Sequence, residues 1–71
     1  TNKKVWELIK ESVPLSTRFG DACISEKHSN FFINKGNATF KDMKRLIDFV
    51  TESVFKKTGI SIEKEIKIIE N

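Results

Sequence analysis

A long amphipathic segment in the second half of the chain constrains the fold more than any other feature. It runs from Phe40 to Lys57, and Thr39 with Asp42 three residues later forms a capping box at its start. Gly59 follows it, where helices commonly end in the left-handed conformation. The apolar residues recur at helical spacing and form one stripe: Met43, Leu46, Ile47, Val50 and Val54, with Phe40 at its head. The segment therefore predicts a helix that buries one face against another layer.

The segment after this helix alternates in the manner of a half-buried strand, from Ile60 to Ile69. Isoleucine occupies one parity, broken only by Lys64: Ile60, Ile62, Ile66 and Ile68. The other parity is polar: Ser61, Glu63, Glu65 and Lys67. Because successive side chains of a strand point to opposite faces, we expect one buried face and one polar face.

The first residues predict a short helix over positions 3–12. Asn2 is a suitable N-cap, and Pro14 ends the helix because proline disfavours helical geometry in the residue before it. Trp6 is expected to pack this helix onto a sheet.

The middle of the chain predicts strands and turns. A strand is expected over 18–24, where Gly20 marks a bend or a close approach of the backbone. Residues 25–30 are polar and predict a loop, Phe31–Asn34 is a brief apolar strand, and 35–37 is a turn. The order α-β-β-α-β predicts a small α+β domain over residues 1–71, with helices packed on one face of a three-stranded sheet.

Composition excludes several classes of protein. The chain has 71 residues, 38% hydrophobic and 32% charged, which is typical of a globular domain rather than a disordered segment. No apolar run is long enough to span a membrane, and we expect no membrane partner. The net charge is only +3, with basic and acidic residues interleaved, so we expect no nucleic acid. Cys23 is the single cysteine and reads as a small buried hydrophobe, which fits a reducing cytosol.

Several short motifs occur in an order that is typical of one family. They are Phe19-Gly20-Asp21-Ala22, Ser25-x-Lys27-His28, Phe32-Ile33-Asn34-x-Gly36-Asn37-Ala38-Thr39, and Glu65 followed by Ile68-Ile69. In this combination the chain resembles the C-terminal domain of the UDP-N-acetylenolpyruvoylglucosamine reductase (MurB) family. The resemblance implies an oxidoreductase of the bacterial cytoplasm that makes UDP-N-acetylmuramate for peptidoglycan, with FAD and NADPH as cofactors. It also implies that this chain is one part of a longer enzyme.

The resemblance assigns a catalytic role to Glu65. Taken alone, Glu65 reads as a solvated carboxylate, but the family's catalytic glutamate opens the terminal stretch that Glu65 opens here. Reduction of the enolpyruvyl group builds negative charge on the substrate, and a protonated carboxyl group beside that charge stabilises it. Desolvation and a like-charged neighbour favour the protonated form. The general-acid serine and the catalytic arginine of the family belong to domains that are absent here.

The loop over residues 25–30 holds the other candidate site residues. His28 matches a substrate-contacting position of the family, and the resemblance implies hydrogen bonding to the UDP-sugar rather than proton transfer. Lys27 is a candidate for neutralising the diphosphate. A single histidine without cysteine or carboxylate at ligand spacing argues against a metal site. The glycines are isolated and do not resemble a dinucleotide-binding loop.

These observations favour the substrate-binding domain of a reductase, with a UDP-sugar substrate and the missing FAD-binding and middle domains as partners. By itself such a domain is expected to bind no cofactor and to be inactive. Two alternatives remain open from the residues alone. One is a separate basic α+β module that docks RNA or a protein through Lys41, Lys44 and Arg45, and the other is a purely structural remnant.

Overall fold

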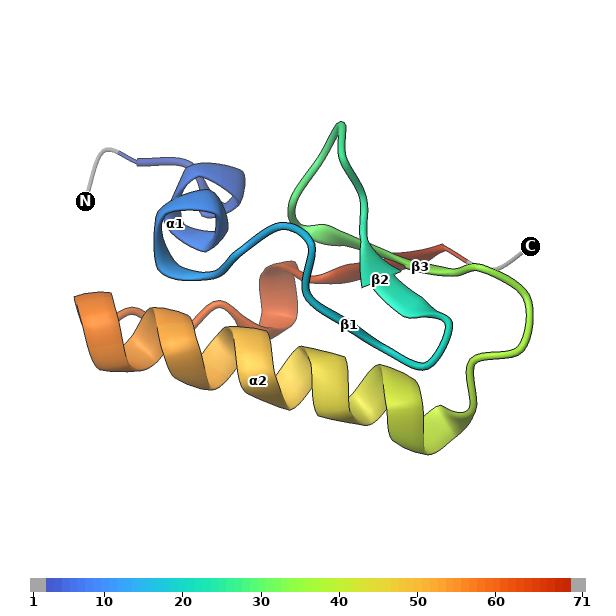
Figure 1. Ribbon diagram of the computed structural model, residues 1–71. Helices are drawn as coiled ribbons and strands as arrows, with labels where there is room; N and C mark the ends of the chain where they lie inside the picture. Colours follow the sequence, from blue (N-terminus) through green and yellow to red (C-terminus); the bar gives the residue numbers. More distant parts are fainter. Residues whose placement is uncertain (1–2, 70–71) are drawn as a thin grey trace.

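The structure is a computed structural model that describes residues 3–69, and it has one sheet and two α-helices in that range (Figure 1). The elements follow in the order α1 (Val5–Ser12), β1 (Arg18–Phe19), β2 (Ala22–Ile24), β3 (Phe31–Asn34), α2 (Phe40–Thr58), the 3₁₀ turn η1 (Glu63–Glu65) and β4 (Lys67–Ile69). The predicted α+β class is confirmed. The sheet of the described residues has four strands where three were expected.

The additional strand arises because residues 18–24 form a hairpin rather than one strand. Phe19 pairs with Ala22, and the chain reverses at Gly20. Gly20 has φ +58°, a left-handed conformation that glycine adopts without steric cost. A Cβ atom at Gly20 would also lie 2.5 Å from Oδ2 of Asp42. The predicted bend and the predicted close approach are therefore both present at Gly20.

The sheet has the order β1-β2-β3-β4, and only its last pair is parallel. A parallel pair needs a crossover connection, and α2 provides it between β3 and β4. In this pair Phe31 lies beside Lys67 and Ile33 beside Ile69. Figure 1 shows α2 running along one side of the sheet, with α1 packed near its C-terminal end.

The predicted capping interactions are present at both ends of α2. The Thr39 hydroxyl accepts a hydrogen bond from the Asp42 backbone N–H (3.1 Å), and the Asp42 carboxylate accepts one from the Thr39 backbone N–H (3.0 Å). At the other end Gly59 is left-handed, with φ +77°, and its N–H donates to the Phe55 carbonyl (2.7 Å). The helix extends one residue beyond the predicted end, to Thr58.

The first helix is shorter than predicted. It starts at Val5, and the backbone N–H of Lys4 donates to the Glu7 carboxylate (3.2 Å) at the cap position. Asn2, the predicted cap, lies outside the described residues. The expectation that Trp6 packs this helix onto the sheet is wrong, because the Trp6 side chain is 42% exposed. Leu8 and Ile9 are the buried residues of α1.

The core lies between α2 and one face of the sheet. Most of the predicted apolar stripe is buried, although Ile47 is half-buried and Phe40 is 84% exposed. Phe32, Ala22 and Ile24 fill the space from the sheet, and Cys23 is half-buried on the opposite face rather than fully buried. The buried hydrophobic residues are Leu8, Ile9, Val13, Ala22, Ile24, Phe32, Met43, Leu46, Val50, Val54 and Ile62.

The predicted strand over residues 60–69 is wrong for most of its length. Only Lys67–Ile69 is a strand, because the chain turns at η1, where the Glu65 N–H donates to the Ile62 carbonyl (2.9 Å). This turn lets Ile62 enter the core at 1% exposure. Lys64, which interrupts the isoleucine alternation, lies in the turn. Glu65 therefore projects from a 3₁₀ turn before β4 and does not lie on the polar face of a strand.

Candidate functional site

The loop between β2 and β3 is held in shape by a buried serine. The Ser25 hydroxyl accepts hydrogen bonds from the backbone N–H groups of Lys27 and His28, each at 3.3 Å. The His28 carbonyl accepts from the Phe31 N–H (2.9 Å), and the His28 ring centroid lies 5.2 Å from that of Phe31. Lys27 and His28 are themselves exposed. The loop thus presents both predicted substrate-contacting side chains to solvent on an ordered backbone.

The same loop is joined to the turn that carries Glu65. Asn30 makes both connections: its side-chain amide donates to the Glu65 carbonyl (3.4 Å), and its own carbonyl accepts from the Lys67 N–H (2.9 Å). The structure therefore brings the loop of Lys27 and His28 and the turn of Glu65 to the same end of the sheet. Sequence reasoning assigned no role to Ser25, whose hydroxyl contacts are local to its own loop. It also missed Asn30, because the partners of Asn30 are backbone groups that only the parallel β3–β4 pairing brings close.

Glu65 is exposed, and within residues 3–69 its carboxylate makes no ion pair. An ionised carboxylate accepts hydrogen bonds and cannot donate one, whereas a protonated carboxyl group can donate. Removal of water by another surface and a like-charged neighbour both favour the protonated form of a carboxyl group.

Lys27 lines a shallow basic concavity on the face of the sheet away from α2. The concavity has a volume of about 450 Å³, and Arg18 and Lys35 are its other cations. The Arg18 guanidinium is held 3.2 Å from the Asp21 carboxylate. Glu26 is the one acid in the lining, so the surface carries an excess of positive charge suited to a phosphate group.

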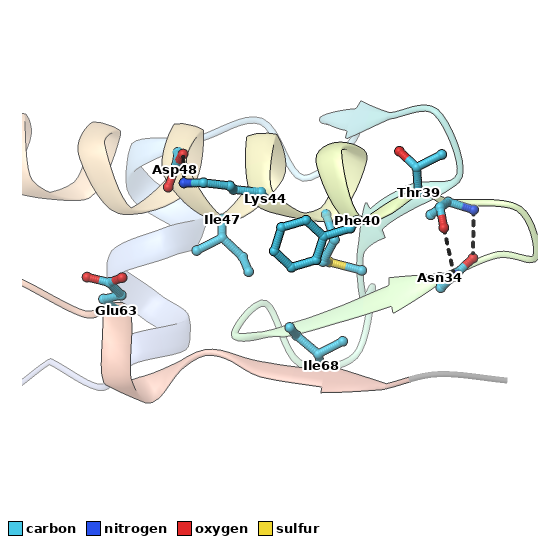
Figure 2. Close-up of a pocket in the computed structure, with 10 residues that line it drawn as sticks. Asn34, Thr39, Phe40, Lys44, Ile47, Asp48, Glu63 and Ile68 are labelled. Atoms are coloured by element: carbon cyan, nitrogen blue, oxygen red, sulfur yellow. Dashed lines mark hydrogen bonds and ion pairs between the residues drawn. The ribbon is translucent and has the colours of Figure 1, made fainter.

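A second concavity lies between α2 and β4, and Figure 2 shows the residues that line it. This α2–β4 groove has a volume of about 440 Å³, and its apolar lining comes from Phe40, Met43, Ile47, Ile68 and Ala38. Its polar rim includes the Lys44–Asp48 ion pair (3.0 Å) and Glu63. Sequence reasoning missed this groove, although Phe40 at the head of the apolar stripe was a signal for it.

Two features of the described residues bear on anion and metal binding. The first turn of α2, where a helix could accept a phosphate, is already closed by the Thr39 hydroxyl and the Asp42 carboxylate. Within residues 3–69 there is no cluster of three or more side chains of the metal-binding types. No helix in the same range has the length and hydropathy required to cross a membrane.

The basic side of α2 offers limited support for the alternative of RNA binding. Lys44 is already paired with Asp48, which leaves Lys41 and Arg45 as its remaining cations from the predicted set. The two cations left in this set are few compared with the several phosphate contacts of typical nucleic-acid sites.

Comparison with known proteins identifies the family. The model of the UDP-N-acetylenolpyruvoylglucosamine reductase C-terminal domain matches residues 1–69. The chain belongs to this family. A curated UDP-N-acetylenolpyruvoylglucosamine reductase from Pelagibacter ubique is 68% identical over 97% of the chain. Those of Rickettsia akari and Rickettsia prowazekii are each 48% identical, over 93% and 94% of the chain.

These relatives are much longer than the chain. The matched region makes up 23% of the Pelagibacter protein, 22% of the Rickettsia akari protein and 23% of the Rickettsia prowazekii protein. The chain thus spans about a quarter of the length of these curated relatives. No solved structure gives a significant match to this chain.

Proposed function

We propose that this chain is the substrate-binding C-terminal part of a bacterial reductase that converts the enolpyruvyl ether of UDP-N-acetylglucosamine into UDP-N-acetylmuramate. Its contribution to the reaction is the carboxyl group of Glu65. The observation that supports this role best is the Asn30 connection, because it joins the Glu65 turn to the loop of Lys27 and His28. Family membership supports the reaction class.

The chemistry assigned to Glu65 follows from where charge builds up. Addition of hydride to C3 of the enolpyruvyl group leaves negative charge on C2 and on the adjoining carboxylate. A protonated Glu65 beside that carboxylate donates a hydrogen bond to it and lowers the energy of the charged state. This role requires that the other domains remove water from Glu65, since an ionised Glu65 would repel the charge it must stabilise.

The loop residues bind the substrate in this proposal. His28, supported by the Phe31 ring, donates a hydrogen bond to the UDP-sugar. Lys27 lies at the edge of the basic concavity and neutralises part of the diphosphate charge. The Ser25 hydroxyl holds both backbone amides, so it fixes the loop before substrate arrives.

The cofactors are assigned to other domains of the reductase. FAD and NADPH need a site for a pyrophosphate, and the capped start of α2 carries an acid where such a group would bind. When bound elsewhere in the enzyme, the flavin and nicotinamide supply the hydride. We place the complete enzyme in the bacterial cytoplasm, where its nucleotide-sugar substrate and NADPH occur.

The decisive experiment changes Glu65 in the full-length reductase. Glu65→Ala is expected to lower kcat by about 100- to 1,000-fold, the usual effect of removing one donor to a developing negative charge. Glu65→Gln keeps an N–H donor and is expected to fall between Glu65→Ala and the unchanged enzyme. Steady-state oxidation of NADPH with the UDP-sugar substrate measures both.

Glu52→Ala is the matched control, because Glu52 is an exposed acid on α2 and takes no part in the site. It is expected to leave kcat unchanged. Normal turnover by Glu65→Ala in a correctly folded enzyme would rule out the catalytic assignment.

The binding assignment predicts a different kinetic pattern. His28→Ala is expected to raise KM for the UDP-sugar by about 10-fold, with a smaller change in kcat, because it removes a contact made before and during the reaction. Lys27→Ala is expected to raise KM more at low salt than at high salt, since ionic contacts are screened. A kcat effect with unchanged KM in both variants would contradict a binding role.

A further inference from the structure

The α2–β4 groove exposes several adjacent apolar side chains to solvent, which is rare on the surface of a monomeric soluble protein. Phe40 is 84% exposed and Ile68 is 49% exposed, and both line the groove (Figure 2). The floor between them is formed by Met43, Ile47 and Ala38. Contiguous exposed apolar groups of this kind mark interaction sites. The patch predicts that another surface covers it.

The edge of the sheet beside this groove is also open. Within residues 3–69 the sheet ends at β4, which pairs only with β3. The Lys67 N–H points toward β3, where it donates to the Asn30 carbonyl. Because successive N–H groups of a strand point to opposite sides, the Ile68 N–H points to the open edge. An edge strand with exposed isoleucines is a template for a further strand.

The rim of the groove indicates the chemistry of its occupant. Lys44 and Asp48 neutralise each other at 3.0 Å, and Glu63 adds one negative charge. This lining does not attract a polyanion, so neither a phosphate nor RNA suits the groove. An extended polypeptide with apolar side chains satisfies both the open edge and the apolar floor.

The source of that polypeptide follows from the length of the relatives. The matched region makes up 22–23% of the length of the curated reductases. The rest of each reductase is therefore more than three times as long as the matched region. Glu63, at the start of η1, lines the groove, and Glu65 ends the same turn. A segment in the groove would therefore lie close to Glu65, where the proposed function requires another domain.

We propose that an extended segment from the remaining part of the same reductase polypeptide pairs with the open edge of β4 and inserts apolar side chains into the α2–β4 groove. This proposal depends on the proposed function, because it takes the remaining part of the polypeptide to be that of the reductase. It assigns the groove to an interface within one molecule rather than to a ligand or a second copy.

Hydrogen exchange in the unaltered full-length reductase tests the pairing without any substitution. The Ile68 amide is expected to exchange more than about 100-fold slower than an unprotected amide, because its N–H becomes a ladder donor. The measurement is made without substrate. An unprotected Ile68 amide overturns the proposal, and so does protection that arises only when the UDP-sugar is added.

Cysteine labelling tests the groove itself in the same full-length protein. Phe40→Cys and the control Arg45→Cys are treated with a water-soluble maleimide, and the labelled peptides are quantified by mass spectrometry. Phe40→Cys is expected to react at least about 10-fold slower than Arg45→Cys, an exposed position on the same helix that does not line the groove. Equal rates overturn the proposal.

The concentration dependence identifies the occupant. Protection within one molecule is independent of protein concentration over about a hundredfold range, whereas protection by a second copy increases with concentration. An increase with concentration overturns the proposal. None of these readouts uses activity, so an unaffected Glu65→Ala enzyme with a protected groove would reject the catalytic role and leave the interface standing.

Discussion

At the scale of single residues, Gly20 shows how closely the hairpin approaches α2. Its φ of +58° reverses the chain between β1 and β2, and its missing side chain leaves room for the Asp42 carboxylate. That carboxylate is half of the capping box of α2. One glycine therefore determines the hairpin turn and also permits the contact between hairpin and helix.

Gly20→Ala is expected to lower the free energy of unfolding by about 2–3 kcal/mol. The left-handed conformation costs an L-residue roughly 1–2 kcal/mol, and displacement of Asp42 weakens a cap that contributes about 1 kcal/mol. Gly59→Ala is the matched control, because Gly59 is also left-handed but a Cβ there meets no atom within 4 Å. Its expected loss is about 1 kcal/mol. Urea denaturation measures both, and equal losses would contradict the importance of the close approach.

The proposed site residues could be chosen from the sequence only through the family motifs. Glu65, His28 and Lys27 are ordinary exposed polar residues in pattern and composition. The residues that organise them, Ser25 and Asn30, act through backbone groups of distant or looped segments. The Asn30 contacts depend on the tertiary pairing of β3 with β4, and the Ser25 contacts depend on the shape of the loop; hydrophobic periodicity encodes neither.

At the scale of elements, prediction succeeded where local signals agreed and failed where a turn interrupted an alternating pattern. The cap residues and the stripe both specified α2, and the structure has it nearly residue for residue. The hairpin at Gly20 and the η1 turn at Lys64 interrupt segments that read as continuous strands. In both cases the departure serves packing, since η1 buries Ile62 and the hairpin brings Ala22 into the core.

The capping box predicts a measurable share of the stability of α2. Thr39→Ala removes the acceptor for the Asp42 N–H and is expected to lower the free energy of unfolding by about 1 kcal/mol. Thr39→Ser keeps the hydroxyl and is expected to remain within about 0.5 kcal/mol of the unchanged protein. Thermal or urea unfolding followed by circular dichroism distinguishes them. A serine variant as unstable as the alanine variant would show that the hydroxyl is not the important group.

At the scale of the whole molecule, the domain presents the side chains of the proposed site on surfaces that it does not cover itself. Glu65 and His28 are exposed at one end of the sheet, and the α2–β4 groove is open beside β4. The exposed surface of Phe40 and the exposed half of Ile68 gain no hydrophobic stabilisation from this fold. The class of fold was predictable, whereas these open surfaces were not, because they depend on the position of β4 at the sheet edge.

The isolated chain is therefore expected to show no reductase activity. Purified residues 1–71 are expected to retain no FAD after dialysis and to leave NADPH unoxidised in the presence of the UDP-sugar. The full-length enzyme is expected to retain FAD and to oxidise NADPH under the same conditions. Absorbance spectra measure the flavin and the nicotinamide directly. Retention of stoichiometric FAD by the 71-residue chain would contradict the assignment of the cofactor site to other domains.

The parallel pairing of β3 with β4 has a consequence for the order of assembly. β1, β2 and β3 are joined by short connections and can associate early, whereas Lys67 meets Phe31 only after α2 has formed and folded back. Glu65 immediately precedes β4, so it reaches the loop of His28 in the final stage of folding. A nascent or partly folded chain thus keeps the Glu65 carboxyl group apart from the loop of Lys27 and His28 until the rest of the architecture is complete.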